Sequence, residues 1–110
     1  MCALADLDVD RGVTALVHGQ ALAIFRTHDG GVYALGNHDP FTRSSGIARG
    51  IVGRRGAVPY VGSPAHGNRF DLRTGRCLDD AHVSVPAYDA KVVDGYVLVG
   101  HRKAPQDRPA

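Results

Sequence analysis

A short stretch at residues 63–75 constrains the fold of this chain more than any other. It begins with Ser63-Pro64 and contains Gly67, so a tight loop is expected there. Residues 69–72, which read RFDL, predict a short strand, and the following Thr-Gly pair predicts a turn. A second loop, residues 36–41 with the sequence GNHDPF, also follows a predicted strand. The chain is therefore organised by two strand-and-loop units.

Composition and periodicity favour an all-β protein. Every acidic residue is Asp, and only Lys91 and Lys103 among the 13 basic residues are Lys, so the usual helix-surface residues are scarce. No segment of about ten residues has the apolar face of a helix. Asp29-Gly30 and Asp94-Gly95 each separate two apolar runs, which predicts two hairpins with type I′ turns. We expect about nine or ten short strands in an antiparallel sandwich or barrel.

The predicted strands cover residues 13–17, 21–26, 32–35, 51–53, 57–62, 69–72, 76–78, 88–93 and 96–100. At the N-terminus, the alternation over residues 4–10 also predicts a strand with an acidic outer face. Residues 36–50 have no periodicity, and a loop of that length in a small domain is usually functional. The tail, residues 101–110, has almost no apolar side chain to bury and is expected to be disordered.

The two loops resemble the cluster-holding loops of Rieske [2Fe–2S] proteins, which read Cys-x-His and Cys-Pro-x-His-Gly, followed by Arg-Phe-Asp and Thr-Gly. Here Asn37 and Asp39 stand at the first pair of ligand positions, Ser63 replaces the second Cys, and only His66 matches the family. A Rieske cluster needs two thiolates on one iron and two imidazoles on the other. The four positions therefore predict a Rieske-like shape that binds no [2Fe–2S] cluster.

A chain that keeps the Rieske-like scaffold but lacks the cluster ligands resembles the small subunit of assimilatory NAD(P)H-dependent nitrite reductase. The specific part is the segment from Asn37 to Phe41, NHDPF, combined with Ser63-Pro64, and the similarity covers nearly the whole chain, residues 3–99. The resemblance implies a Rieske-like antiparallel β-sandwich or barrel as one domain over residues 1–100. This domain would contain a small inserted lobe at about residues 36–72, formed by the two former cluster loops. At the N-terminus the family suggests a strand near residues 2–4 in place of the alternating one.

The same resemblance implies the function. The chain is expected to be a non-catalytic subunit of an enzyme that reduces nitrite to ammonium with NADH or NADPH. It would have no catalytic residue and no cofactor of its own, because FAD, a [4Fe–4S] cluster and sirohaem belong to the large subunit in that family. The small subunit would dock on the large one and support it, and the expected contact surface is the tip formed by residues 37–51 and 63–69.

Candidate partner-binding residues are mostly arginines, whose planar guanidinium pairs well with carboxylates at interfaces. A solvated basic rim is the alternative reading. Phe41 either plugs the small lobe or is an exposed anchor, and we favour the plug because aromatic side chains in loops normally bury. The candidates are Phe41, Arg43, Arg49, Arg54, Arg55 and Arg69.

Other classes are less consistent with the sequence. The net charge of +2, without basic runs and interleaved aromatics, argues against nucleic acid. No apolar run approaches the roughly 20 residues that span a bilayer, no signal peptide is apparent, and two isolated cysteines make no disulfide framework. These features predict a cytoplasmic protein. A stand-alone Rieske-like binding module and a Rieske-type ferredoxin are the alternative functions, the second requiring a cluster.

Two further readings concern the loop tip. His38, Asp39 and His66 are adequate ligands for a divalent metal such as Zn²⁺, so an adventitious metal there is one hypothesis. We favour the alternative, in which Asp39 accepts hydrogen bonds from loop N–H groups and Asn37 and Ser63 bond locally, holding the loops where iron does in relatives. A hydrolase built from Ser63, His66 and Asp71 finds no support, since no Gly-x-Ser-x-Gly motif is present.

Overall fold

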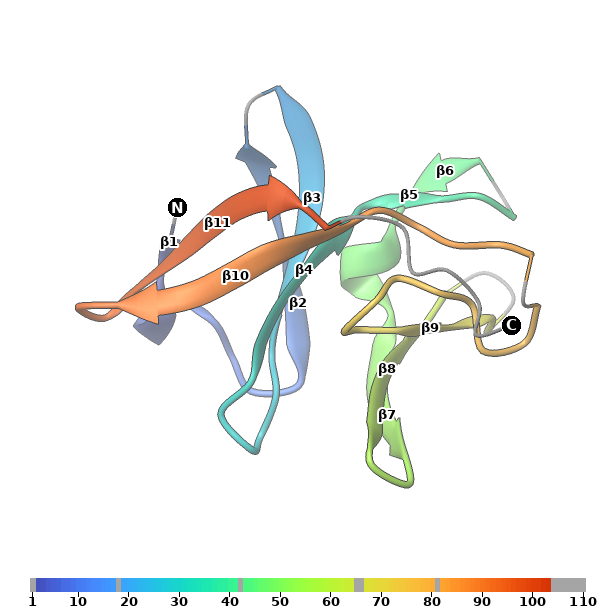
Figure 1. Ribbon diagram of the computed structural model, residues 1–110, viewed down its shortest axis with the longest axis horizontal. Coiled ribbons are helices and arrows are strands. Elements are labelled where there is room, and N and C mark those ends of the chain that lie inside the picture. Colours follow the sequence, from blue (N-terminus) through green and yellow to red (C-terminus); the bar gives the residue numbers. More distant parts are fainter. Residues whose placement is uncertain (1, 18, 42, 65–66, 81, 104–110) are drawn as a thin grey trace.

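The computed structural model describes residues 2–17, 19–41, 43–64, 67–80 and 82–103. Figure 1 shows a large twisted sheet beside a smaller lobe. The sheet consists of β1 (Cys2–Ala3), β2 (Arg11–Val17), β3 (Gln20–Arg26), β4 (Val32–Gly36), β10 (Ala87–Val93) and β11 (Tyr96–Arg102), with a 3₁₀ turn η1 (Leu4–Asp6) after β1. The lobe contains β5 (His38–Asp39), β6 (Ser44–Ser45), the 3₁₀ turn η2 (Ile47–Arg49), β7 (Ile51–Arg55), β8 (Val58–Gly62) and β9 (Arg69–Asp71).

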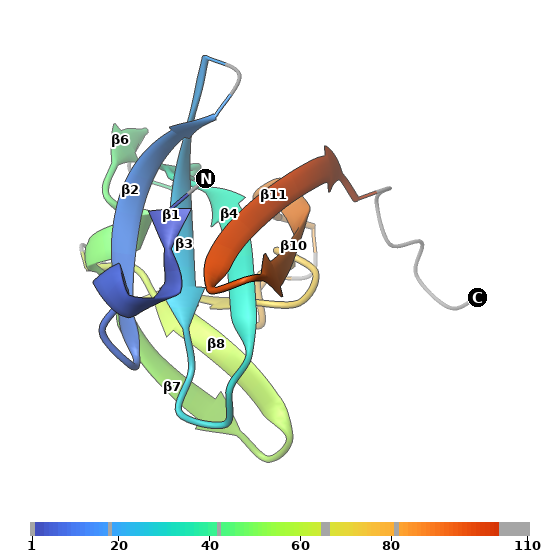
Figure 2. The same cartoon turned by 90° about the vertical axis from the view of Figure 1, so that its left-hand side faces the viewer.

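The large sheet has the order β1-β11-β10-β4-β3-β2, and all its strand pairs are antiparallel. Figure 2 shows that it curls into a half-barrel. Strand β3 is buried on both faces: Phe25 packs towards the lobe, whereas Ile24 packs against Leu7 and Val97 on the other face. Burial on both faces explains why β3 has a continuous apolar run instead of an alternating one.

The lobe packs on the sheet through one shared core. Its three-stranded sheet has the order β7-β8-β9, and β5 pairs with β6 in a separate ribbon. A Cβ on Gly12 of β2 would lie 2.3 Å from the carbonyl oxygen of Ala48, so only glycine allows β2 to approach η2 this closely. The buried residues of the shared core are Ala23, Phe25, Leu35, Ile47, Ala48, Val61, Phe70, Leu72, Cys77, Val85 and Ala87.

The all-β, Rieske-like fold predicted from the sequence is confirmed. Eleven strands lie in the described part of the chain. The second predicted hairpin has the expected turn, since Asp94 and Gly95 have φ angles of 51° and 79°. The first hairpin also forms, but the predicted type I′ turn was wrong, because Gly30 has positive φ and Asp29 does not. A longer loop connects the strands, and Thr27 closes it by donating its N–H to the carbonyl of Gly31 at 2.9 Å.

Several boundaries differ from the sequence prediction: β2 begins two residues earlier and β7 ends two residues later than predicted, and the short strands β5 and β6 lie within the predicted loop 36–50. The strand near residues 2–4 that the resemblance implied is present as β1, whereas the alternating pattern over residues 4–10 forms η1 in place of a strand, because the Leu4 N–H donates to the carbonyl of Gly95 and the Leu7 N–H donates to the carbonyl of Leu4. The strand predicted over residues 76–78 is reduced to isolated bridges. Strand β11 continues to Arg102, two residues into the predicted tail, and residues 104–110 lie outside the described part. No helix in the described part is long and apolar enough to cross a membrane.

Candidate functional site

The first of the two loops is organised around Asn37, which follows β4 and is only 5% exposed. Its side-chain oxygen accepts the N–H of Ala48 at 2.8 Å. Its backbone carbonyl accepts the N–H groups of Gly46 and Ile47 at 3.0 and 3.2 Å. One buried residue thus accepts three backbone hydrogen bonds at the start of η2, through its side-chain oxygen and its backbone carbonyl. The sequence predicted local hydrogen bonding by Asn37 but not these partners.

The two loops are joined by a hydrogen bond between side chains. The hydroxyl of Ser63 donates to Asp39 Oδ2, and both residues are at most 3% exposed. The other carboxylate oxygen of Asp39 accepts the N–H of Phe41 at 2.9 Å, and its backbone carbonyl accepts the N–H of Arg43 at 2.7 Å. Ser63 also closes its own loop, because its carbonyl accepts the N–H of Gly67 at 2.8 Å. The prediction that local hydrogen bonds hold both loops is confirmed.

The described residues at the ligand positions do not fit a [2Fe–2S] cluster. None of Asn37, Asp39 and Ser63 is a thiolate or an imidazole, and their side-chain oxygens are already hydrogen-bonded within the protein. His66, the fourth position, lies outside the described residues, and so does any metal site that depends on it. His38 is exposed while Asp39 is buried, as expected for adjacent residues on opposite faces of β5. The part of the chain that is described holds no group of three or more His, Cys, Asp or Glu side chains able to bind a metal ion.

Phe41 plugs the small lobe. Its ring packs against the shared core and lies 6.1 Å from the ring of Phe70 at an interplanar angle of 48°. Such a tilted arrangement is favourable for an aromatic pair. The preferred reading of Phe41 from the sequence is therefore confirmed.

The five candidate arginines do not form one surface. Figures 1 and 2 place the β5–β6 ribbon, where Arg43 lies, at the top of the lobe, and the β7–β8 turn beside Arg54 and Arg55 at its lower end. Arg69 pairs with Asp79 at 2.7 Å and lies over the ring of Tyr60. That hydrogen-bonded ion pair lowers the pKa of Asp79 from its ordinary value and raises the pKa of Arg69.

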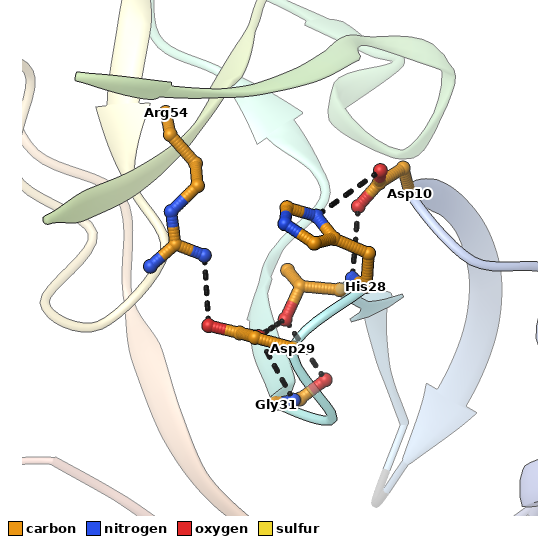
Figure 3. Close-up of polar contacts among 6 residues, drawn as sticks. Asp10, His28, Asp29, Gly31 and Arg54 are labelled. Carbon is orange, nitrogen blue, oxygen red and sulfur yellow. Dashed lines mark hydrogen bonds and ion pairs between the residues drawn. The ribbon is translucent and has the colours of Figure 1, made fainter. Parts of the chain in front are cut away.

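Arg54 belongs to a polar cluster that the sequence did not reveal. Figure 3 shows Arg54 Nη1 bound to Asp29 Oδ2, at 2.7 Å, across the space between the lobe and the β3–β4 turn. Asp29 Oδ1 accepts the hydroxyl of Thr27 and, at 3.2 Å, the N–H of Gly31. The Thr27 hydroxyl, followed by Arg54, holds the pKa of Asp29 well below its usual range.

The same cluster contains a second pair next to Asp29. His28 donates its N–H to Asp10 Oδ1 at 3.2 Å, and His28 Nδ1 lies 3.6 Å from Asp10 Oδ2 (Figure 3). The Asp29-Gly30 dipeptide was the only sequence signal for this cluster, and it indicated a turn without naming the partners. We call the group Asp10, His28, Asp29 and Arg54 the clamp.

Comparison with known proteins identifies the family of this chain. The Rieske-like [2Fe–2S] domain family matches residues 1–100. The nitrite reductase (NADH) small subunit of Salmonella typhimurium is 40% identical over 98 residues, which is 88% of this chain and 91% of the relative. The chain belongs to the nitrite reductase small-subunit family. The structure of the Escherichia coli protein NirD superposes with a TM-score of 0.82 at 38% identity, covering 94% of this chain and 93% of NirD.

A third relative places a similar module inside a larger protein. The nitrite reductase [NAD(P)H] large subunit of Klebsiella oxytoca is 36% identical over 104 residues, covering 92% of this chain but only 11% of that one. The family expected from the sequence is thus confirmed, and the chain is homologous to part of an oxidoreductase complex.

Proposed function

We propose that this chain docks on the large subunit of an NAD(P)H-dependent nitrite reductase and supports it. The enzyme would reduce nitrite to ammonium during nitrate assimilation in the cytoplasm. FAD, a [4Fe–4S] cluster and sirohaem would all lie in the large subunit. The small subunit itself would work without a cofactor or a catalytic residue.

The hydrogen bond between Ser63 and Asp39 carries this proposal. Residues at the positions of former iron ligands are used to fix the two loops against each other, which favours a shaped surface over a redox centre. A tip held in one conformation loses little conformational freedom on binding, so more of the contact energy remains as affinity. We infer that the tip, residues 37–51 and 63–69, keeps the partner-facing role and has lost the electron-carrying one.

The Klebsiella oxytoca relative supports the choice of partner. There a similar module is part of the large-subunit chain, so the two are held together at high effective concentration. The relatives of Salmonella typhimurium and Escherichia coli are named as small subunits, and a subunit of that kind would have to dock through its own surface. Among the candidate arginines at the tip, Arg43 and Arg49 are exposed and enter no ion pair with the residues that the structure describes.

A pull-down tests the partner. The tagged chain is recovered from its own nitrate-grown cells and the absorption spectrum of the eluate is recorded. We expect a large polypeptide with sirohaem and flavin bands. A colourless chain recovered alone, from cells with active nitrite reductase, would favour the stand-alone binding module.

Reconstitution tests the support role. The purified large subunit is assayed for NAD(P)H-dependent nitrite reduction with and without the small chain, and its thermal inactivation is followed in parallel. We expect higher activity or slower inactivation when the small chain is present. A chain that carries its own [2Fe–2S] absorption after purification would contradict the cofactor-free role and favour a ferredoxin.

A further inference from the structure

A groove of about 460 Å³ lies where β2, η2 and β7 meet. Its lining includes Arg11 and Gly12 of β2 and Ala48 and Arg49 of η2. Ile51, at the start of β7, also lines it and is 78% exposed. Arginine is enriched at partner interfaces, and Ile51 beside two arginines gives a partner an apolar contact next to charged ones.

The groove contains two arginines that form no ion pair with the described residues. Neither Arg11 nor Arg49 has an ion-pair partner among residues 2–17, 19–41, 43–64, 67–80 and 82–103. Asp10 is the acidic residue in the lining, but its carboxylate already accepts the N–H of His28 and lies 3.6 Å from the His28 ring. The groove is therefore complementary to carboxylates.

Strand β7 borders this groove with a free edge. Within the described part of the chain it pairs with β8 on one side only, as the outer strand of the order β7-β8-β9. The carbonyl of Pro59 accepts the N–H of Leu72, so the backbone groups of Pro59 point towards β9. Pro59 and the opposite residue, Arg54, therefore form a non-hydrogen-bonded pair in the β7–β8 ladder. By alternation, the N–H and C=O groups of Val52 and Arg54 point away from β8.

The edge is bordered by open space for most of its length. Val52 lines the main groove and also a second hollow of about 280 Å³, which is bordered by Thr27, His28, Gly53 and Arg54. The polar side chains Asp10, His28 and Arg54 in that second hollow belong to the clamp and already have partners within it. Unpaired strand edges are normally shielded from other chains, and this edge combines free backbone groups with an exposed Ile51.

We propose that the groove binds an extended, acidic segment of the large subunit. Its backbone would add to the free edge of β7 at Val52 and Arg54, its carboxylates would pair with Arg11 and Arg49, and an apolar side chain would cover Ile51. Strand addition of this kind draws affinity from main-chain hydrogen bonds and specificity from side-chain pockets. This inference rests on the proposed function, and it extends the expected contact surface from Arg49 and Ile51 of the tip to Arg11 of β2 and the edge of β7.

Affinity measurements with the purified large subunit test the proposal. The variants are Arg11→Glu, Arg49→Glu, their combination and Ile51→Thr; each affected side chain is exposed, so folding is checked by thermal unfolding against wild type. We expect the double reversal to weaken binding by at least about tenfold and to reduce its salt dependence, because like charges would face each other. Arg102→Glu, on β11, and Val92→Thr, a 41%-exposed apolar residue on β10, are the matched controls and should bind like wild type.

The outcomes separate this inference from the proposed function. If wild type fails to bind the large subunit at all, both are overturned. If wild type binds and the folded double variant binds with the same affinity and salt dependence, docking stands and the groove is excluded. Equal losses in Arg49→Glu and Arg102→Glu would likewise exclude it, because they would reflect overall charge alone.

Discussion

Polar contacts at two places hold the fold together, one between the two loops of the lobe and one between the lobe and the large sheet, and these differ in exposure more than in chemistry. Both use a carboxylate that accepts hydrogen bonds: Asp39 with Ser63 at the loop tip, and Asp29 with Arg54 in the clamp. Asp39 and Ser63 are 2% and 3% exposed, whereas the side chains of Asp29 and Arg54 are 42% and 33% exposed. Water replaces a broken contact in the clamp but cannot reach the tip, so the tip contacts should contribute far more to stability.

The largest effect is expected from Asp39→Ala. The substitution removes the acceptor of the Ser63 hydroxyl and of the Phe41 N–H in a buried site. Leaving buried donors without a partner should lower the free energy of unfolding by about 3 kcal/mol, as measured by urea denaturation.

Asp39→Asn is the matched control for this change. Its amide keeps one acceptor oxygen and nearly the same shape, and Ser63 can accept from the amide nitrogen. We expect a loss well below that of Asp39→Ala. Equal losses in both variants would mean that the charge of Asp39, not its hydrogen bonds, holds the tip.

A smaller effect is expected from Ser63→Ala, at about 1.5 kcal/mol, because the carboxylate of Asp39 retains the Phe41 N–H. The double variant with Asp39→Ala measures the coupling. If the two residues act through their shared bond, the double variant should lose clearly less than the sum of the single losses. Additive losses would show that the loops are held independently of each other.

The contrast between tip and clamp also explains what the sequence could predict. The hairpins at Asp29-Gly30 and Asp94-Gly95 are local features, since turn chemistry and flanking apolar runs specify them. The turn type at Asp29 could not be predicted, because Asp29 is drawn into contacts with Thr27 and with Arg54, a residue from another strand. The end of β11 was placed two residues early for a similar reason: its last residues are polar, and backbone pairing with β10 extends the strand.

The tip was more predictable than the clamp. A motif with its ligands replaced identifies Asp39 and Ser63 as residues that face each other, provided that the fold is retained, and the structure brings this pair together. The clamp has no such motif, because Asp10 and His28 are 18 positions apart and meet only in the folded chain. The candidate arginines were grouped because they are close in the sequence. In the structure they lie at opposite ends of the lobe, because β7 leads away from the tip.

Breaking the Arg54–Asp29 pair of the clamp should have a minor effect that depends on salt. Arg54→Ala leaves Asp29 with the Thr27 hydroxyl and the Gly31 N–H, so the thermal unfolding midpoint should fall by no more than about 3 °C at low salt. The difference from wild type should shrink at high ionic strength, because exposed pairs are screened. A fall as large as that of Ser63→Ala, unaffected by salt, would contradict the comparison.

The smallest effect is a pH dependence specific to Asp29. Its pKa is lowered in the folded protein, so its contribution to stability is present above the unfolded-state pKa, near 3.8, and is lost as the pH falls towards the folded value. The midpoint of Asp29→Asn, measured against wild type, should therefore differ most above about pH 4 and converge with it in stronger acid. Subtracting one protein from the other removes the titration of the carboxylates they share. A difference that grows in acid would mean that protonated Asp29 stabilises the fold, and that the clamp is held by its neutral hydrogen bonds instead of by charge.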